Sequence, residues 1–349
     1  MNELQYKKER DPFFDNAKFL LIFLVVLAHG ISPLKKEHDT VYMVWYTINC
    51  FHMPCFIFLS GFFAKKYIVN GKFNIQKPFY YLMLFLFSQA AVWCFEYFVL
   101  KDVNISKSVV AARSSLWYLQ CLVTWYVLLP FMDKLKPKYM LVIAFAVSLL
   151  MGYDEKLPGA FSVSRVLVHL PFFLLGYYCT KERLQKLVDG AWKKPVALLI
   201  FGAAALVTFF KRAVIPERIV VASYQYQSIT SEYFSFHGMW LARAAFYVLA
   251  LALCWAFLVW VPRKKTFFTR FGNRTLQVYI GHRFLYLAEL QYGWGALFNN
   301  KGMFFVLLGI ITATVFILSL KIFEYPFRWI ANIKIAPLLK ESERPEGGK

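Results

Sequence analysis

The sequence predicts an all-α fold, a polytopic membrane protein built as a bundle of about ten transmembrane helices. Apolar residues make up 59% of the 349 residues and aromatic residues 19%, whereas charged residues account for only 17%. The mean hydropathy is +0.48. Apolar runs long enough to cross about 30 Å of hydrocarbon recur along the whole chain. These observations exclude a soluble fold.

Ten segments have the length and composition of membrane-spanning helices. They are 15–34, 41–64, 78–100, 115–131, 138–152, 165–180, 195–210, 239–260, 273–291 and 302–323. The first has no small-residue cleavage site, so we expect it to be retained and not removed as a signal peptide. The sequence thus predicts one membrane domain over 15–330, between a cytosolic N-terminal segment (1–14) and a flexible cytosolic tail (331–349).

The distribution of positive charge orients this bundle. The formal net charge is +20. With a cytosolic N-terminus, the inner segments hold about 26 Lys and Arg residues and the outer segments about 11, as the positive-inside rule requires. We therefore expect a multi-pass protein of the plasma membrane with both termini cytosolic and its basic clusters against anionic lipid. Nucleic-acid binding is not indicated, because the chain has no groove-reading helix or basic stacking platform.

Cofactor and metal motifs are absent from the sequence. The six cysteines all fall within predicted spans without metal-ligand spacing, which favours free buried thiols. No glycine-rich phosphate loop, zinc motif or Ser/His/Asp signature is present. We expect no metal site and no permanently bound cofactor.

Two ionisable residues interrupt the first apolar segment. Lys18 and His29 are eleven residues apart, so they share one helix face about 16 Å apart along the axis. Ionisable groups at membrane depth normally face a bundle interior or a wet cavity, which indicates a functional site. The alternative is a snorkelling lysine and a histidine satisfied by a neighbouring helix. We expect Asp15 to cap the helix and pair with Lys18, not to take part in chemistry.

Several motifs resemble the membrane acyltransferase 3 family, and within it the fucose 4-O-acetylase-like branch. The first motif is a basic residue separated from a histidine by ten residues, which here are Lys18 and His29. The others follow in order across nearly the whole chain: FHMPCFIFLSGFF (51–63), SSLWYLQCL (114–122), HLPFFLLGY (169–177), GNRTLQVYIGH (272–282) and EYPF (324–327). Many members carry arginine at the position of Lys18, and lysine keeps a point charge able to meet a phosphate.

This resemblance implies transfer of an acyl group, usually acetyl, from a cytosolic acyl-coenzyme A to a hydroxyl of a cell-envelope glycan or exopolysaccharide. An alcohol needs a positioned base to attack a thioester, and histidine is the usual choice. We expect His29 to be this base and Lys18 to hold a coenzyme A phosphate. Acyl-coenzyme A would then be a donor substrate and not a resident cofactor.

Further site residues are expected on the second and ninth predicted spans. His52 lies near the kink expected at Pro54, where it would either stabilise the oxyanion or bond carbonyls freed by the proline. His282 and Arg283 cannot share one helix face, and the family-like position favours His282 as the catalytic residue. Arg274 is a weaker candidate for a donor phosphate.

Polar and aromatic groups near the outer helix ends are candidates for binding the acceptor. We single out Trp117, Glu96 and Arg165 as substrate-binding residues. The alternative is interfacial anchoring, since aromatics collect in membrane belts and terminal charges snorkel.

The rival function is a polytopic transporter or exporter of a glycan or small molecule. Intramembrane Lys, His, Arg and Glu residues are also typical of carriers. Against it, the two halves show no matched pair of interrupted helices. The sequence does not indicate the oligomeric state.

Overall fold

The computed structural model describes residues 10–69, 72–102, 111–154, 162–212, 214–222 and 225–339. The first nine residues of the predicted N-terminal segment and the last ten of the predicted tail lie outside these ranges. Within them every regular element is a helix except for one antiparallel pair of two-residue strands, β1 (Ile68–Val69) and β2 (Lys72–Phe73). The all-α fold class is confirmed.

Every one of the ten predicted spans contains a long helix. These are α1 (Pro12–Ile31), α2 (Asp39–Ala64), α3 (Gln76–Cys94), α4 (Trp117–Met132), α5 (Pro137–Leu150), α6 (Val163–Tyr178), α8 (Lys193–Lys211), α10 (Met239–Trp260), α11 (Thr275–Tyr292) and α12 (Lys301–Leu318). Three shorter helices were not predicted: α7 (Lys181–Val188), α9 (Glu217–Val221) and α13 (Tyr325–Asn332).

Single turns of helix connect these elements. They are η1 (Ser32–Lys36), η2 (Lys65–Tyr67), the π-turn η3 (Phe95–Val99), η4 (Ser114–Leu116), η5 (Met151–Tyr153), η6 (Tyr226–Ser228), η7 (Phe236–Gly238), η8 (Thr269–Phe271), η9 (Trp294–Phe298), η10 (Lys321–Glu324) and η11 (Ala336–Leu338). Of these, η1 and η9 lie in contact with each other and close one end of the bundle beside α1 and α12.

Several of the described helices are long and apolar enough to cross a membrane. Five of them are long and apolar enough to span a membrane by themselves. Two bent pairs, α6 with α7 and α12 with the chain after it, raise the number to as many as seven. The polytopic architecture is therefore confirmed, while the count of ten transmembrane helices stays a prediction.

The start of α1 is fixed by its own cap and by a buried asparagine. Asp11 is the N-cap, and its carboxylate accepts a hydrogen bond from the Phe13 amide at 3.1 Å. The expectation that Asp15 caps the helix is thus wrong, because α1 begins one turn earlier. Asn16 is fully buried and donates to the carbonyls of Pro262 and Lys264 at 2.9 and 3.0 Å. It therefore ties α1 to the connection between α10 and α11.

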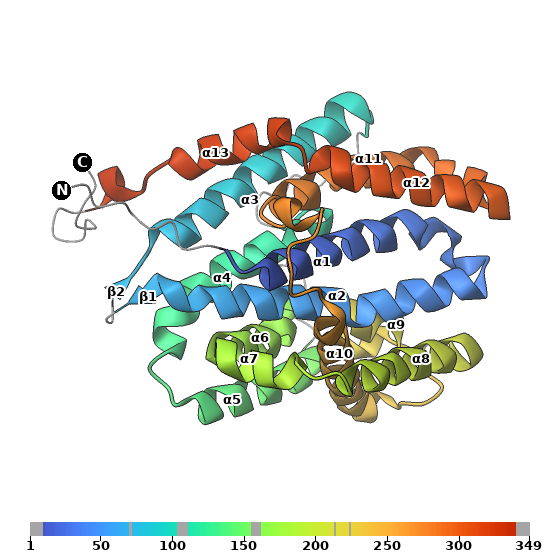
Figure 1. Ribbon diagram of the computed structural model, residues 1–349, viewed down its shortest axis with the longest axis horizontal. Coiled ribbons are helices and arrows are strands. Elements are labelled where there is room, and N and C mark those ends of the chain that lie inside the picture. The colour runs from blue at the N-terminus through green and yellow to red at the C-terminus, as the bar shows by residue number, and fades with distance from the viewer. Residues whose placement is uncertain are drawn as a thin grey trace.

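The centre of the bundle is the contact between α2 and α6, which Figure 1 shows crossing the middle of the molecule. Gly61 of α2 lies against the Phe173 carbonyl, and Gly176 of α6 lies against the Phe58 carbonyl. A Cβ at either glycine would collide with backbone. The glycines of the FHMPCFIFLSGFF and HLPFFLLGY motifs thus allow two helices to pack backbone to backbone, as small residues do in membrane bundles.

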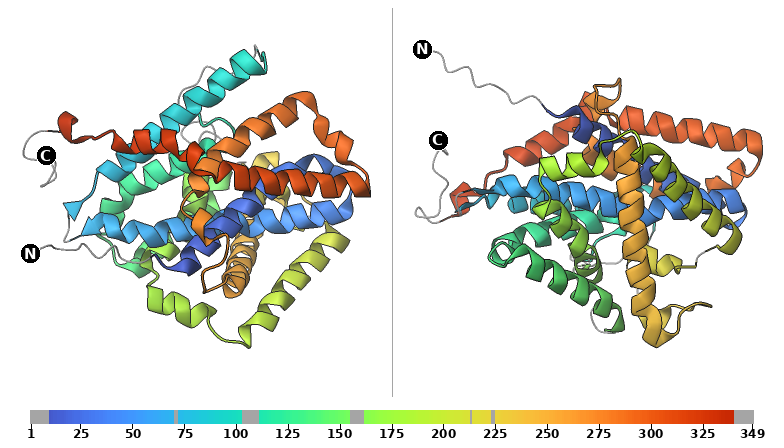
Figure 2. Two further views of the ribbon diagram at one scale, coloured as in Figure 1. Left: turned by 45° about the horizontal axis from the view of Figure 1, so that its top comes forward. Right: turned by 60° about the horizontal axis from the view of Figure 1, so that its bottom comes forward.

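Helices α1, α11 and α12 form a second packing unit beside this centre. Helix α12 packs against α1, and α11 contacts both of them; the left view of Figure 2 shows the red-orange α12 in front of this part of the bundle. Gly272 lies against the backbone of Asp15, so the chain entering α11 approaches the start of α1 closely. As a consequence, the face of α1 that carries Lys18 and His29 is flanked by α2 on one side and by α11 on the other.

Candidate functional site

A large cavity opens at the end of the bundle where α1 and α11 begin. Its volume is about 710 Å³, within the range of small-molecule sites. It is lined by Arg10, Asp11, Phe14, Asp15, Lys18 and Val25, by Met53, Phe56, Leu59, Ser60, Phe63, Lys66 and Tyr67, by Lys77, Tyr81, Tyr118, Leu122, Tyr126 and Lys181, and by Asn273, Thr275, Leu276 and Tyr279. We call it the basic cavity.

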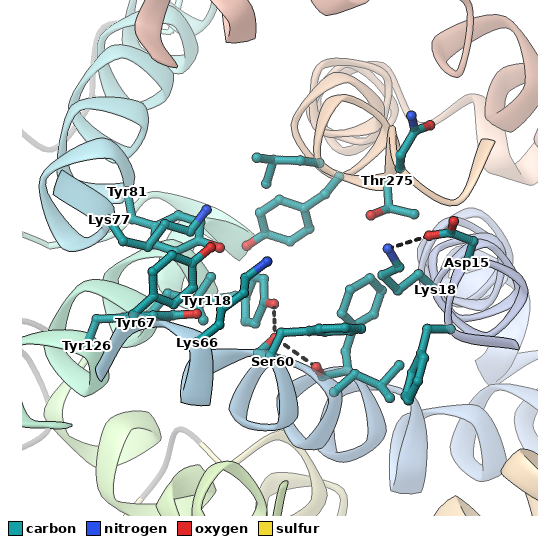
Figure 3. A pocket seen from close by; sticks show the side chains of 18 of the residues that line it. Asp15, Lys18, Ser60, Lys66, Tyr67, Lys77, Tyr81, Tyr118, Tyr126 and Thr275 are labelled. Carbon is teal, nitrogen blue, oxygen red and sulfur yellow. Dashed lines mark hydrogen bonds and ion pairs between the residues drawn. The ribbon is translucent and has the colours of Figure 1, made fainter. Parts of the chain in front are cut away.

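Cationic side chains surround the mouth of the basic cavity. Lys18 pairs with Asp15 at 2.7 Å, and Lys181 pairs with Asp11 at 2.8 Å. Lys66 and Lys77 instead lie over tyrosine rings, and among the described residues no carboxylate pairs with either. Figure 3 shows Lys18, Lys66 and Lys77 pointing into one space from three elements. This mouth is suited to several phosphate charges.

Tyrosines and a serine line the interior of the basic cavity. The Tyr118 hydroxyl lies 2.7 Å from Ser60 Oγ, which itself donates to the Phe56 carbonyl at 2.9 Å. The Tyr118 ring packs edge-on against Tyr279, whose hydroxyl donates to the Ser115 carbonyl. The hydroxyl groups are therefore held in place by the protein, and the wall they form is rigid and aromatic.

The basic cavity leads toward the predicted catalytic histidine. Its lining runs along α1 from Lys18 to Val25, which is one helical turn before His29. On α11 it runs to Tyr279, whose ring centroid lies 6.3 Å from that of His282. On both helices the lining of the cavity therefore ends within one helical turn of an imidazole, His29 on α1 and His282 on α11.

His29 and His282 are brought together by the packing of α1 against α11. Their ring centroids are 5.3 Å apart, and the His29 ring also packs against Tyr286 at 4.8 Å. His282 is 2% exposed; its Nδ1 lies 2.9 Å from the Val278 carbonyl. Its Nε2 is buried without a hydrogen-bond partner among the described residues. Such an unpaired nitrogen is available to a ligand.

A second cavity is lined by this histidine pair. Its volume is about 450 Å³, and apolar side chains dominate its lining. It is lined by Val26, His29, Gly30, His282, Leu285, Tyr286, Glu289, Trp294, Gly295, Leu297, Phe298, Leu307, Ile310, Ile311 and Thr314. We call it the apolar cavity. Two imidazoles therefore line the apolar cavity and lie about one helical turn beyond the lining of the basic cavity.

His52 lies near this site but lines neither of the two cavities. It is 5% exposed, and its Nδ1 lies 2.8 Å from the Ile48 carbonyl one turn earlier in α2. Its neighbour Met53 lines the basic cavity instead. A catalytic role for His52 stays a prediction, and the contact that the structure records is the one with its own helix.

Arg274 is at the expected end of the bundle but faces the chain after α12. It donates to the Ser319 carbonyl at 3.0 Å, and its Nε lies 3.6 Å from the Glu324 carboxylate. The residues on either side of it, Asn273 and Thr275, line the basic cavity. Donor binding by Arg274 stays a prediction, and its recorded partners hold α11 to the segment that follows α12.

The predicted acceptor residues form two clusters outside both cavities. The Trp117 ring stacks on His169 with centroids 5.3 Å apart, and the Arg165 guanidinium lies 5.0 Å from the Trp117 centroid. Glu96 pairs with Arg113 at 2.5 Å. Acceptor binding by Trp117, Arg165 and Glu96 stays a prediction.

The cavities contain functional candidates that sequence reasoning missed. Lys66, Lys77 and Lys181 line the basic cavity, and no motif or spacing in the sequence marks them. The three lysines follow or begin three different helices, so no local spacing relates them. Their excess at one membrane face was the only available signal.

Comparison with known proteins gives one match. No curated protein and no solved structure matches the chain significantly. The family model described as an acyltransferase domain matches residues 11–322, from the cap of α1 to the turn after α12. This range includes the basic cavity from Asp11 onward, the histidine pair and the apolar cavity. The chain therefore belongs to the acyltransferase domain family and is a membrane acyltransferase.

Proposed function

We propose that this protein is an O-acyltransferase of the fucose 4-O-acetylase-like branch. It would transfer an acyl group, most simply acetyl, from acyl-coenzyme A to a hydroxyl of a cell-envelope glycan or exopolysaccharide. The observation that carries the proposal is the alignment along α1 and α11 of a basic cavity with the pair formed by His29 and His282.

The basic cavity is the proposed donor site. Coenzyme A carries three phosphate groups on one end and a thioester on the other, joined by an extended apolar arm. Lys18, Lys66 and Lys77 at the mouth would meet the phosphates, because charge-assisted hydrogen bonds to phosphate are strong. The aromatic interior, which ends at Tyr279, would guide the pantetheine arm toward the histidine pair.

The proposed chemistry uses His29 as general base. Its imidazole takes the proton of the acceptor hydroxyl while the hydroxyl oxygen attacks the thioester carbonyl carbon. The tetrahedral intermediate collapses, the carbon–sulfur bond breaks, and the coenzyme A thiolate receives the proton from the His29 imidazolium. His282 Nδ1–H donates to the Val278 carbonyl, so the neutral ring presents an Nε2 lone pair, and the proposed role of His282 is to accept a hydrogen bond at this site. His52 and Arg274 are proposed as supporting groups only.

The proposed orientation follows from the donor. Acyl-coenzyme A is cytosolic, so the mouth of the basic cavity would face the cytosol and both termini would lie on that side of the plasma membrane. The glycan would reach the opposite end of the bundle, where Trp117, Arg165 and Glu96 are its proposed contacts. The family match does not favour the exporter alternative, which also has no need of a donor site.

The test is donor turnover by purified protein in nanodiscs. Free thiol release is followed with acetyl- and succinyl-coenzyme A, with and without an envelope glycan extract, beside the variant His29→Ala. Thiol release by the wild type that disappears in the variant would support the proposal and identify the donor. Absence of thiol release, together with absence of thermal stabilisation by coenzyme A, would overturn it.

A further inference from the structure

The apolar cavity is not explained by a donor site or by a purely polar acceptor. Val26, Leu285, Leu307, Ile310 and Ile311 supply much of its wall. A free sugar placed there would lose water from its hydroxyl groups without gaining partners, which costs free energy for each unpaired group. The cavity therefore fits a ligand that is largely hydrocarbon.

The lining of the same cavity includes exposed apolar side chains of the kind that face lipid in a membrane protein. Three of its lining side chains are large apolar residues with high exposure: Leu285 at 48%, Leu297 at 67% and Ile310 at 47%. They come from α11, η9 and α12. A hydrocarbon ligand could enter sideways from the bilayer without crossing a polar surface.

Three polar groups lie within this apolar wall. His282 Nε2 and Glu289 Oε2 are both buried without a hydrogen-bond partner among the described residues. His29 lies beside His282 in the same wall. Leaving such groups unpaired costs about 1–3 kcal/mol each, and because both of these atoms accept hydrogen bonds, a ligand hydroxyl would donate to one of them. A saturated acyl chain, in contrast, would leave His282 Nε2 and Glu289 Oε2 unpaired.

We propose that the apolar cavity binds the acyl acceptor as an amphiphile, with its hydrocarbon chain along α12 and its hydroxyl head at His29, His282 and Glu289. The acceptor is then a hydroxylated lipid or a lipid-linked sugar that arrives laterally from the bilayer. This inference rests on the proposed function and narrows it, because donor and acceptor meet at the histidine pair from two different cavities.

The inference is tested by photolabelling of the full chain in nanodiscs. One probe is dodecanol with a diazirine near the end of its chain, and the other is the matched dodecane without the hydroxyl. Labelled positions are mapped by mass spectrometry. The hydroxyl should enrich labelling within residues 285–311 by about fivefold over the hydrocarbon, as one or two net hydrogen bonds would give.

A matched pair of variants on α12 sharpens this test. Ile310→Trp places an indole in the cavity, whereas Ile317→Trp places it at a similarly exposed position outside the cavity wall, 52% against 47%. The first variant should abolish the enrichment, and the second should leave it unchanged. Equal labelling by both probes, or unchanged enrichment in Ile310→Trp, would overturn the inference.

Two further measurements distinguish a failure of the acceptor proposal from a failure of the proposed function. Diazirine-bearing decanoyl-coenzyme A should not label residues 285–311; strong labelling there would assign the cavity to the donor chain and overturn the inference. Acetyl-coenzyme A hydrolysis is measured on the same samples. If the wild type hydrolyses acetyl-coenzyme A but the hydroxyl of the probe does not enrich labelling, only the amphiphilic acceptor is contradicted. If the wild type neither hydrolyses nor binds the donor, the proposed function itself is contradicted.

Discussion

The basic and apolar cavities share two helices but differ in almost every other respect. Both are lined by α1 and α11. The basic cavity adds α2, α3 and α4 with lysines and tyrosines, while the apolar cavity adds η9 and α12 with aliphatic side chains. The contrast teaches that α1 and α11 supply the imidazoles, whereas the other lining helices determine the chemical character of each cavity.

The largest effect is expected at the histidine pair. His29→Ala should lower acyl transfer by roughly 10²–10⁴-fold, the usual contribution of a general base. The protein should remain folded, because the imidazole lines a cavity. Thiol release and the elution profile in detergent check this. His237→Ala, at an exposed position in η7, serves as the control and should keep full activity. Undiminished transfer by His29→Ala would contradict the role of the pair.

The next prediction distinguishes donor binding in the basic cavity from catalysis at the histidines. Lys18→Ala should raise KM for acyl-coenzyme A by about 10–100-fold and change kcat little, since a charge-assisted hydrogen bond contributes about 1.5–3 kcal/mol. Steady-state kinetics against donor concentration check this. Lys18→Arg should keep most donor affinity, because it preserves the cation. A fall in kcat with unchanged KM for Lys18→Ala would place Lys18 in the chemistry instead.

A third change acts on α2, which lines the basic cavity only. Gly61→Ala should destabilise the protein by about 1–3 kcal/mol, because the added Cβ meets the Phe173 carbonyl. Thermal unfolding in detergent checks this. Gly202→Ala in α8 is the matched control, since nothing lies within 4 Å of its added Cβ. It should be neutral or stabilising by up to about 1 kcal/mol. Equal stability of the two variants would contradict the close crossing of α2 and α6.

The smallest expected effect concerns Lys66 and Lys77 at the mouth of the basic cavity. Lys66→Gln and Lys77→Gln should each raise the donor KM by about threefold to tenfold, less than Lys18→Ala because water screens a charge at a cavity mouth. The increase should shrink at high salt. Lys138→Gln, an exposed lysine at the start of α5, is the control and should leave KM unchanged. A salt-independent KM in the wild type would argue against phosphate binding at this mouth.

Sequence reasoning located the helices and the histidines better than the cavity walls. Apolar runs fix where long helices form, and each predicted span contains one. It missed α7, because KERLQKLV is too polar for a span and too short for a clear period. His29 was singled out as an ionisable residue inside an apolar span and His282 by its motif position, although their proximity depends on how α1 packs against α11. Periodicity along one helix carries no such information.

The positions of the other candidate residues also depend on tertiary contacts. Arg274 turns to Ser319 and Glu324, which lie far along the chain, and this preference has no local sequence signal. The lysines of the basic cavity stand on separate elements that only folding brings together. In contrast, the pairing of Lys18 with Asp15 was predictable, since the two residues are one helical turn apart.

A structure of the protein with a non-hydrolysable acetyl-coenzyme A analogue in nanodiscs would test the central claim most directly. We expect the phosphates at Lys18, Lys66 and Lys77, the pantetheine arm along Tyr118 and Tyr279, and the acyl group beside His29 and His282. The apolar cavity should stay free of the donor. An analogue bound outside the basic cavity, or one whose acyl group points away from His29, would contradict the account.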